Sequence, residues 1–238
     1  MLLQAALNGP FGKADHEAVP VSPEELTRDA ALCAAAGAGA IHMHPRDSEG
    51  RESLDAAVVD EVARAVRKAC GVPVGVSTGA WIEPDVRRRV KLIREWTEPG
   101  YASVNLSEEG AGDVIAALIE AGIGIEAGVW SVEDAESLAA ADVSHGLTRI
   151  LVEPVDLTAD NAVEAVDEIH RALDATQLAA PRLEHGDGEA TWVLISDAVR
   201  RGIDTRVGLE DTQHLPNGEL ATGNAALIRA ALALGAGE

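Results

Sequence analysis

The sequence predicts a closed (β/α)8 barrel, a TIM barrel, formed by residues 1–238 as one domain. A short apolar or β-branched run, a turn and an amphipathic stretch follow one another eight times along the chain. This alternation implies a parallel sheet. Eight units imply closure, because an open doubly wound sheet usually has about five or six strands and a GxGxxG turn after the first, which is missing here. Such a barrel needs about 250 residues, nearly the whole length of this chain.

Each unit supplies one strand and one helix. The expected strands are residues 2–7, 40–44, 72–77, 102–106, 124–129, 149–152, 182–185 and 205–209. The expected helices are residues 23–36, 54–69, 83–96, 113–121, 132–141, 159–173, 190–201 and 224–234. The first helix has the clearest signals, because Ser22 is a good N-cap, Pro23 suits the first helical position and Gly37 can end the helix.

Composition excludes a nucleic-acid partner. The chain has 40 acidic and 19 basic residues, for a net charge of −21, whereas phosphate binding needs clustered Lys and Arg. The densest basic run is residues 87–89, inside an expected helix, and we interpret it as a solvated face. Aromatic residues make up only 3% of the chain, so small and aliphatic side chains must fill the core.

The first residues of the sequence and its cysteines predict a cytoplasmic protein without a membrane partner. The first ten residues contain no basic segment and no apolar run long enough for a signal or a membrane span. Cys33 and Cys70 are too few for a disulfide framework in so long a chain, and we expect buried free thiols.

Two histidines end the second expected strand. His42 and His44 are two residues apart, so they share a face and lie roughly 6.6–6.8 Å apart along the strand. One such histidine is more often a hydrogen-bonded core residue. Two neutral imidazoles on one inward face can converge on a cation, which makes this pair a candidate metal site.

The eighth expected strand offers a third ligand. Arg206, Gly208 and Glu210 share the inward face, and a buried carboxylate there is costly unless it is paired or bound to metal. Strand eight lies two strand spacings from strand two, about 10 Å, which Glu and His side chains can bridge. His42, His44 and Glu210 would leave a fourth position open for a substrate. The alternative is a simple Arg206–Glu210 ion pair. Asp211 follows and, in an extended strand, points to the other side.

Other polar residues at strand ends are weaker candidates. Glu126 stands between Gly124 and Gly128, which would leave room for a ligand, or it pairs with Arg206 or Arg46. The hydroxyl and amide groups at the ends of strands three and four suit a carboxylate or carbonyl oxygen, and these are Ser77, Ser103 and Asn105. We rank Glu153, Glu184 and His185 lower, because the parity of the last two is ambiguous. The long segment 9–21 after the first strand is expected to cover the site as a lid.

Taken together, these motifs resemble the β-keto acid cleavage enzymes, a family that includes the 3-keto-5-aminohexanoate cleavage enzyme. The similarity is carried by residues 41–47 (IHMHPRD), 76–79 (VSTG), 125–128 (IEAG), 185–186 (HG) and above all 206–211 (RVGLED). The resemblance implies a zinc-dependent (β/α)8 barrel. It also implies an acyl exchange between a β-keto acid and acetyl-CoA that gives acetoacetate and a new acyl-CoA.

The resemblance also implies roles for single residues. His42, His44 and Glu210 would hold zinc or another divalent metal, and Ser77, Glu126, and Ser103 or Asn105 would contact the substrate. Arg206, polarised by Asp211, would be the base. Because the pKa of arginine exceeds ~12, Asp211 itself or a water that it orients is an alternative base. Barrels of this kind commonly associate, so we expect a homo-oligomer.

Two other functions stay open. An amidohydrolase-type hydrolase also uses an HxH strand end, and His185 and Asp211 could complete it, but that pattern usually closes strand one. A non-catalytic ligand-binding barrel would keep the metal ligands and lose the base. For the phosphates of CoA, Arg46, Arg51 and Arg87 are candidate contacts that the sequence does not separate.

Overall fold

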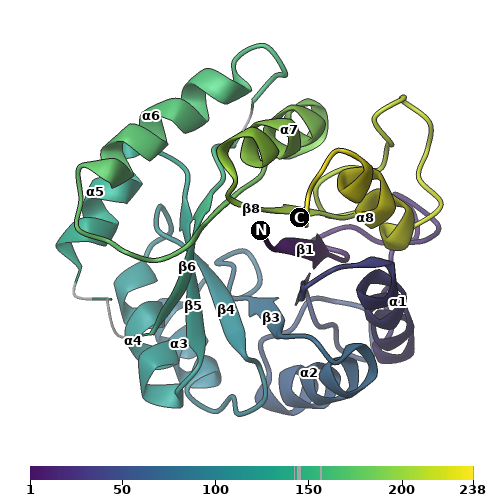
Figure 1. Cartoon of the computed structure of the whole chain (residues 1–238). Coiled ribbons are helices and arrows are strands. Elements are labelled where there is room, and N and C mark those ends of the chain that lie inside the picture. Colours follow the sequence, from purple (N-terminus) through teal and green to yellow (C-terminus); the bar gives the residue numbers. More distant parts are fainter. Residues whose placement is uncertain (142, 144–145, 156, 238) are drawn as a thin grey trace.

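The computed structural model describes residues 1–141, 143, 146–155 and 157–237. Eight parallel strands form a closed barrel in chain order, and helices surround it (Figure 1). The strands are β1 (Leu3–Ala6), β2 (Ala40–Met43), β3 (Val74–Ser77), β4 (Tyr101–Asn105), β5 (Gly124–Val129), β6 (Leu147–Val152), β7 (Arg182–Glu184) and β8 (Asp204–Val207). The predicted (β/α)8 barrel is confirmed.

Each strand is followed by a helix on the outside. The helices are α1 (Pro23–Ala36), α2 (Ala56–Cys70), α3 (Val86–Ile93), α4 (Ala111–Ala121), α5 (Val132–Ala140), α6 (Ala162–Asp174), α7 (Thr191–Arg201) and α8 (Asn224–Ala233), with a short 3-10 turn, η1 (Gly188–Ala190), before α7. α1 begins and ends where predicted. The Ser22 hydroxyl accepts from the Glu25 amide, the Glu25 carboxylate accepts from the Ser22 amide, and Gly37 ends the helix with φ 116°.

The third helix is shorter than predicted and buries one of its arginines. Pro84 keeps the preceding residue out of the helix, so α3 begins after Asp85, whose side chain accepts from the Arg88 amide. The prediction that residues 87–89 form a solvated face is wrong for Arg89, which is only 1% exposed. Its guanidinium donates to the Glu109 carbonyl oxygen and lies 3.4 Å from the Glu108 carboxylate, so it joins α3 to the loop before α4.

The two faces of the strands have different chemistry. Residues that point outward, such as Val74, Val76 and Val207, are buried and apolar and pack under the helices. The inward face below the mouth is instead polar. Gln4 on β1 donates to the Tyr101 hydroxyl at 3.0 Å and to the Glu126 carboxylate at 2.8 Å. These paired groups form the floor beneath the cavity described below.

The barrel closes between β1 and β8 at a point that admits no side chain. The ladder pairs Gln4 with Arg206 and Ala5 with Val207. Just beyond it, a Cβ added at Gly208 would lie 1.7 Å from the Ala6 carbonyl oxygen. Glycine at this position therefore lets the two backbones approach closely where the first and last strands meet.

No described helix is long and apolar enough to cross a membrane. Both cysteines are free thiols, as predicted. Cys33 is buried in α1, whereas Cys70 at the end of α2 is partly exposed, so the expectation of burial holds only for the first.

We predict that Gly208→Ala destabilises the fold. Overpacking in a core costs typically about 1–3 kcal/mol, and a clash with backbone leaves little room for relief. At roughly 2–4 °C per kcal/mol for a chain of this size, the melting temperature should fall by several degrees. The matched control is Gly112→Ala in α4, where an added Cβ meets nothing within 4 Å. Equal melting temperatures for the two variants would contradict the close approach.

Candidate active site and metal centre

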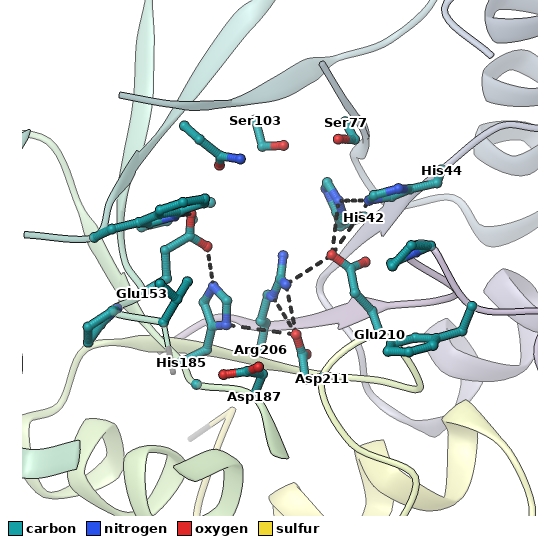
Figure 2. A pocket seen from close by; sticks show the side chains of 18 of the residues that line it. His42, His44, Ser77, Ser103, Glu153, His185, Asp187, Arg206, Glu210 and Asp211 are labelled. Carbon is teal, nitrogen blue, oxygen red and sulfur yellow. Dashed lines mark hydrogen bonds and ion pairs between the residues drawn. The ribbon is translucent and has the colours of Figure 1, made fainter. Parts of the chain in front are cut away.

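The strand ends surround a cavity of about 430 Å³ at the carboxyl-terminal mouth of the barrel. Its lining residues lie in or after each of the eight strands, and Figure 2 shows most of their side chains. The lining includes Pro10, Phe11, His42, His44, Ser77, Trp81, Ser103, Asn105, Trp130, Glu153, His185, Asp187, Arg206, Glu210 and Asp211. Pro10 and Phe11 belong to segment 9–21, which therefore forms part of the wall.

His42, His44 and Glu210 converge as predicted. The Nε2 atoms of the two histidines lie 3.2 Å apart, and Glu210 Oε1 lies 3.7 Å from His42 Nε2 and 3.5 Å from His44 Nε2. Among the described residues, the second carboxylate oxygen of Glu210 is buried and has no hydrogen-bond partner. Two imidazole nitrogens and a carboxylate oxygen within one small volume are a donor set that fits a divalent cation such as zinc.

Asn8 holds the backbone of His44 in place at the mouth of the barrel. Its side-chain amide donates to the His44 carbonyl oxygen at 2.9 Å, and its side-chain oxygen accepts from the His44 amide at 2.9 Å. Asn8 thereby continues the pairing of β1 with β2 by one residue beyond the strands. Both histidines share the inward face because they are two residues apart.

The backbone turns directly after β8, which brings two acids into the cavity. β8 ends at Val207, earlier than predicted, and the amides of Asp211 and Thr212 both donate to the Gly208 carbonyl oxygen at 2.9 Å. Glu210 and Asp211 consequently both line the cavity. The prediction that Asp211 points to the opposite side from Glu210 assumed an extended strand and is wrong.

Arg206 links these two acids. Its guanidinium lies 2.7 Å from Asp211 Oδ1 and 3.1 Å from Glu210 Oε1. Burial alone would lower the pKa of Arg206, but the charges of Asp211 and Glu210 more than offset burial and raise it. Burial raises the pKa of the Asp211 carboxyl even though Arg206 opposes the shift. Arg206 is therefore a fixed cation, and Asp211 is the better proton acceptor of the two.

The two histidines differ in their electrostatic surroundings. Burial lowers the pKa of His42 to about 3, so its ring is neutral. Burial also acts to lower the pKa of His44, but the carboxylates of Glu210 and Glu52 dominate and raise it to about 9. The carboxylates around His44 therefore favour a positive charge, either a proton or a cation, beside His44 and Glu210.

The opposite wall carries a pair that sequence reasoning ranked too low. His185 Nε2 lies 2.6 Å from Glu153 Oε2, and the Trp130 indole donates to Glu153 Oε1 at 3.1 Å. His185 faces the cavity, whereas Glu184 faces the helix layer and pairs with His170 at 2.7 Å. The alternation that was ambiguous in the sequence places every second residue inward, so β6 contributes Glu153 and β7 leads to His185.

A family comparison assigns the chain. The model of the beta-keto acid cleavage enzyme family matches residues 1–237. The chain belongs to the β-keto acid cleavage enzyme family. A curated relative, the 3,5-dioxohexanoate:acetyl-CoA acetone transferase of Paraburkholderia graminis, is 33% identical over 96 residues, which are 40% of this chain and 30% of that protein.

Solved structures share the fold at low identity. ObcA in a ternary complex with a C4-CoA adduct and oxalate has a TM-score of 0.68 and 18% identity, over 92% of this chain and 64% of ObcA. The 3-dehydroquinate dehydratase of Geobacillus kaustophilus HTA426 has a TM-score of 0.62 and 13% identity, over 98% of this chain and 91% of that one. This β-keto acid cleavage enzyme chain thus spans less than two thirds of the length of ObcA and of the curated relative.

The residues predicted to contact the substrate fall into two groups in this enzyme: some line the cavity and one does not. Ser77, Ser103 and Asn105 line the cavity. Glu126 is fully buried and is not part of the lining. Its partners are Gln4 and Arg149, the latter at 3.2 Å, rather than the Arg206 or Arg46 that the sequence suggested. The space beside Gly128, which was expected to hold a ligand, is taken by neighbouring side chains.

The candidate CoA contacts separate as well. Arg46 is buried, and its guanidinium donates to the carbonyl oxygens of Gly9 at 2.9 Å and Phe11 at 2.6 Å, so it fixes the wall of the cavity. Arg51 is exposed and pairs with Asp47 at 2.8 Å. The structure therefore removes Arg46 as a phosphate contact.

We predict about one divalent cation per purified chain, because three ligand side chains converge on one position. They would leave a fourth coordination position open for a substrate. His42→Ala should lose the cation, since it removes one of three donors. His214→Ala, whose side chain lies outside the cavity lining, is the control and should keep it. The measurement is elemental analysis after gel filtration. A metal-free wild-type protein, or His42→Ala with full metal content, would reject the site.

Proposed function

We propose that this chain catalyses a metal-dependent acyl exchange between a β-keto acid and acetyl-CoA, which gives acetoacetate and a new acyl-CoA. The observation that carries the proposal is the position of the Arg206–Asp211 pair beside the His42, His44 and Glu210 cluster in one cavity. Family membership supports the reaction class. The curated relative is itself named as an acetyl-CoA-dependent transferase.

The ligand set would hold zinc or another divalent cation through His42, His44 and Glu210. A bound cation would supply Lewis-acid stabilisation of the negative charge that develops on the keto oxygen. Arg206 keeps Asp211 in place through the 2.7 Å contact to Oδ1, and among the described residues Asp211 Oδ2 has no hydrogen-bond partner. That free oxygen is the proton acceptor in our proposal, in preference to the guanidinium.

The proposed reaction balances with one proton carrier. Asp211 takes a proton from the carbon between the keto and carboxylate groups, and the carbanion attacks the thioester carbonyl of acetyl-CoA. The C–S bond breaks and CoA leaves as a thiolate. The thiolate then adds to the original keto carbonyl of the adduct, and the bond from that carbon to the former nucleophilic carbon breaks. The new thioester and the acetoacetate carbanion separate, and Asp211 returns the proton.

The other residues would bind and orient. The hydroxyls of Ser77 and Ser103 and the amide of Asn105 would contact the substrate carboxylate or carbonyl oxygens. Glu126 belongs to the floor beneath the cavity, so it would support the site through its contacts with Gln4 and Arg149 rather than touch the substrate. A cytoplasmic location and a homo-oligomeric assembly are parts of the same proposal. Glu153 and His185, which pair on the opposite wall, would limit the space for the substituent of the β-keto acid.

Asp211→Asn should keep the metal and lose turnover. The substitution preserves shape and a hydrogen-bond acceptor for Arg206, but it removes the base. Loss of a general base typically lowers the rate by ~10²–10⁴-fold. Metal content and the rate of acetoacetate formation are measured on the same sample. Wild-type turnover would reject Asp211 as the base, and loss of metal would make it a support of the ligands.

Turnover should require acetyl-CoA. The protein is incubated with a panel of β-keto acids with and without acetyl-CoA, and acetoacetate and the new thioester are followed. In the exchange, the carbon nucleophile needs the thioester, whereas in a hydrolase water replaces it. Cleavage at equal rates in both arms would end the exchange proposal and favour the amidohydrolase alternative. No turnover of any panel member by the metal-loaded protein would favour a ligand-binding barrel.

A further inference from the structure

Glu52 is a half-buried acid next to the metal ligands, and neither the sequence motifs nor the proposed reaction uses it. It lies in the loop between β2 and α2, eight residues after His44. The loop folds back on itself as a small hairpin, in which Arg46 pairs with Glu52 in antiparallel fashion and the Ser53 amide donates to the Pro45 carbonyl oxygen at 2.9 Å. Gly50 turns the hairpin with φ 79°. The hairpin returns Glu52 to the strand end that carries His44.

Glu52 binds the far side of the His44 ring. Its Oε1 lies 2.5 Å from His44 Nδ1, the nitrogen that faces away from His42 and Glu210. Because a carboxylate only accepts, His44 Nδ1 carries the hydrogen. When His44 is neutral, this bond leaves the lone pair on Nε2, the atom that lies 3.2 Å from His42 Nε2. Glu52 thus sets the ring orientation and tautomer that a metal ligand needs.

Trp81 covers this pair from the rim of the cavity. Its indole nitrogen donates to both carboxylate oxygens of Glu52, at 3.2 and 3.3 Å, and its ring stacks on His44 with 6.1 Å between centroids and 23° between planes. The loop before it makes room, since a Cβ at Gly79 would lie 2.4 Å from the Trp81 ring. Trp81 is 52% exposed and also contributes to the lining of the cavity.

The bracing is confined to one of the two histidines. Among the described residues, His42 Nδ1 is buried and has no hydrogen-bond partner. His42 is held by its place in β2, whereas His44 lies beyond the end of the strand and needs a side chain to hold its ring. Glu52 supplies that contact.

We propose that Glu52 is a positioning residue for the metal centre: it orients His44 and increases its basicity toward a divalent cation, and Trp81 shields the Glu52–His44 contact from water. The inference rests on the metal site of the proposed function. Removal of such an outer partner of a histidine ligand typically weakens metal affinity by roughly 10–100-fold.

The test compares the zinc dissociation constants of the full-length protein and its variants by competition with a chromogenic chelator. Glu52→Ala removes the acceptor and should weaken affinity roughly 10–100-fold. Glu52→Gln keeps an acceptor without the charge and should lie between Glu52→Ala and wild type. Glu49→Gln, an exposed acid of the same hairpin that pairs with Arg51, should bind zinc like wild type. Trp81→Phe keeps an aromatic ring but loses the indole donor, and it should weaken affinity less than Glu52→Ala.

A second readout separates positioning from general destabilisation. In the zinc-loaded wild type, the His44 Nδ1 proton should give a downfield NMR signal that exchanges slowly with water, because Glu52 and Trp81 enclose it. In Glu52→Ala loaded with excess zinc the signal should be lost, while thermal unfolding shows a folded protein. If Glu52→Ala fails to fold, Glu52→Gln provides both readouts.

The outcomes distinguish two failures. If wild type binds zinc and the folded Glu52 variants bind it equally well, the positioning role is overturned and the proposed function stands. If wild type binds no divalent cation, the proposed function fails and the positioning role falls with it. Weaker binding in Glu49→Gln equal to that in Glu52→Ala would also overturn the proposal, because the effect would then come from hairpin charge in general.

Discussion

Closure of the barrel between β1 and β8 is the constraint on which the metal cluster depends. The ligands come from opposite ends of the chain, His42 and His44 from the second strand and Glu210 from the turn after the last. They meet because β1 pairs with both β2 and β8, and Ala6 is the register partner of His42 on one side. On the other side, Gly208 lets the turn after β8 pass directly over Ala6. A side chain at that point would push Glu210 away from the histidines.

The outer layer holds this closure in place. Asn224, the first residue of α8, accepts from the Leu209 amide at 2.7 Å and donates to the Leu7 carbonyl oxygen at 2.8 Å. It therefore joins the ends of β8 and β1 just below Glu210 and Asn8. Its amide also donates to Asp29 of α1 at 2.6 Å, and burial raises the pKa of that carboxyl to about 6. One asparagine thus couples the last helix, the first helix and the two closing strands, and Figure 1 shows these elements side by side.

The sequence predicts those parts of the site that follow from periodicity. Period-two alternation suffices to bring His42, His44 and Arg206 to one inward face, and eight repeated units suffice for the barrel. What it misses arises where the chain leaves regular structure. The turn after β8 places Asp211 in the cavity although an extended strand would not, and the hairpin after β2 returns Glu52 to His44. Both depend on backbone hydrogen bonds in loops, whose geometry has no period to detect.

Buried partners across the barrel were missed for a related reason. Glu126 meets Arg149 because β5 and β6 pair with a register shift at Glu126, and strand alternation alone does not specify register between neighbours. The turn Asp47–Gly50 could have signalled the hairpin, since Asp and Gly favour turns. Glu52 follows this turn, and the turn follows the strand that ends in the two histidines. That order of residues is the signal that would have identified Glu52.

The charges of the cavity explain why this arrangement suits a cation. Burying carboxylates is costly unless positive charge accompanies them, and the Arg206 guanidinium is shared between Asp211 and Glu210. His44 in turn lies between Glu210 and Glu52, and the negative charges of these two carboxylates favour a proton on the His44 ring. A divalent cation between the histidines and Glu210 would supply the missing charge without that proton. Arg206 would then be left to compensate Asp211, whose free oxygen faces the substrate in the proposed reaction.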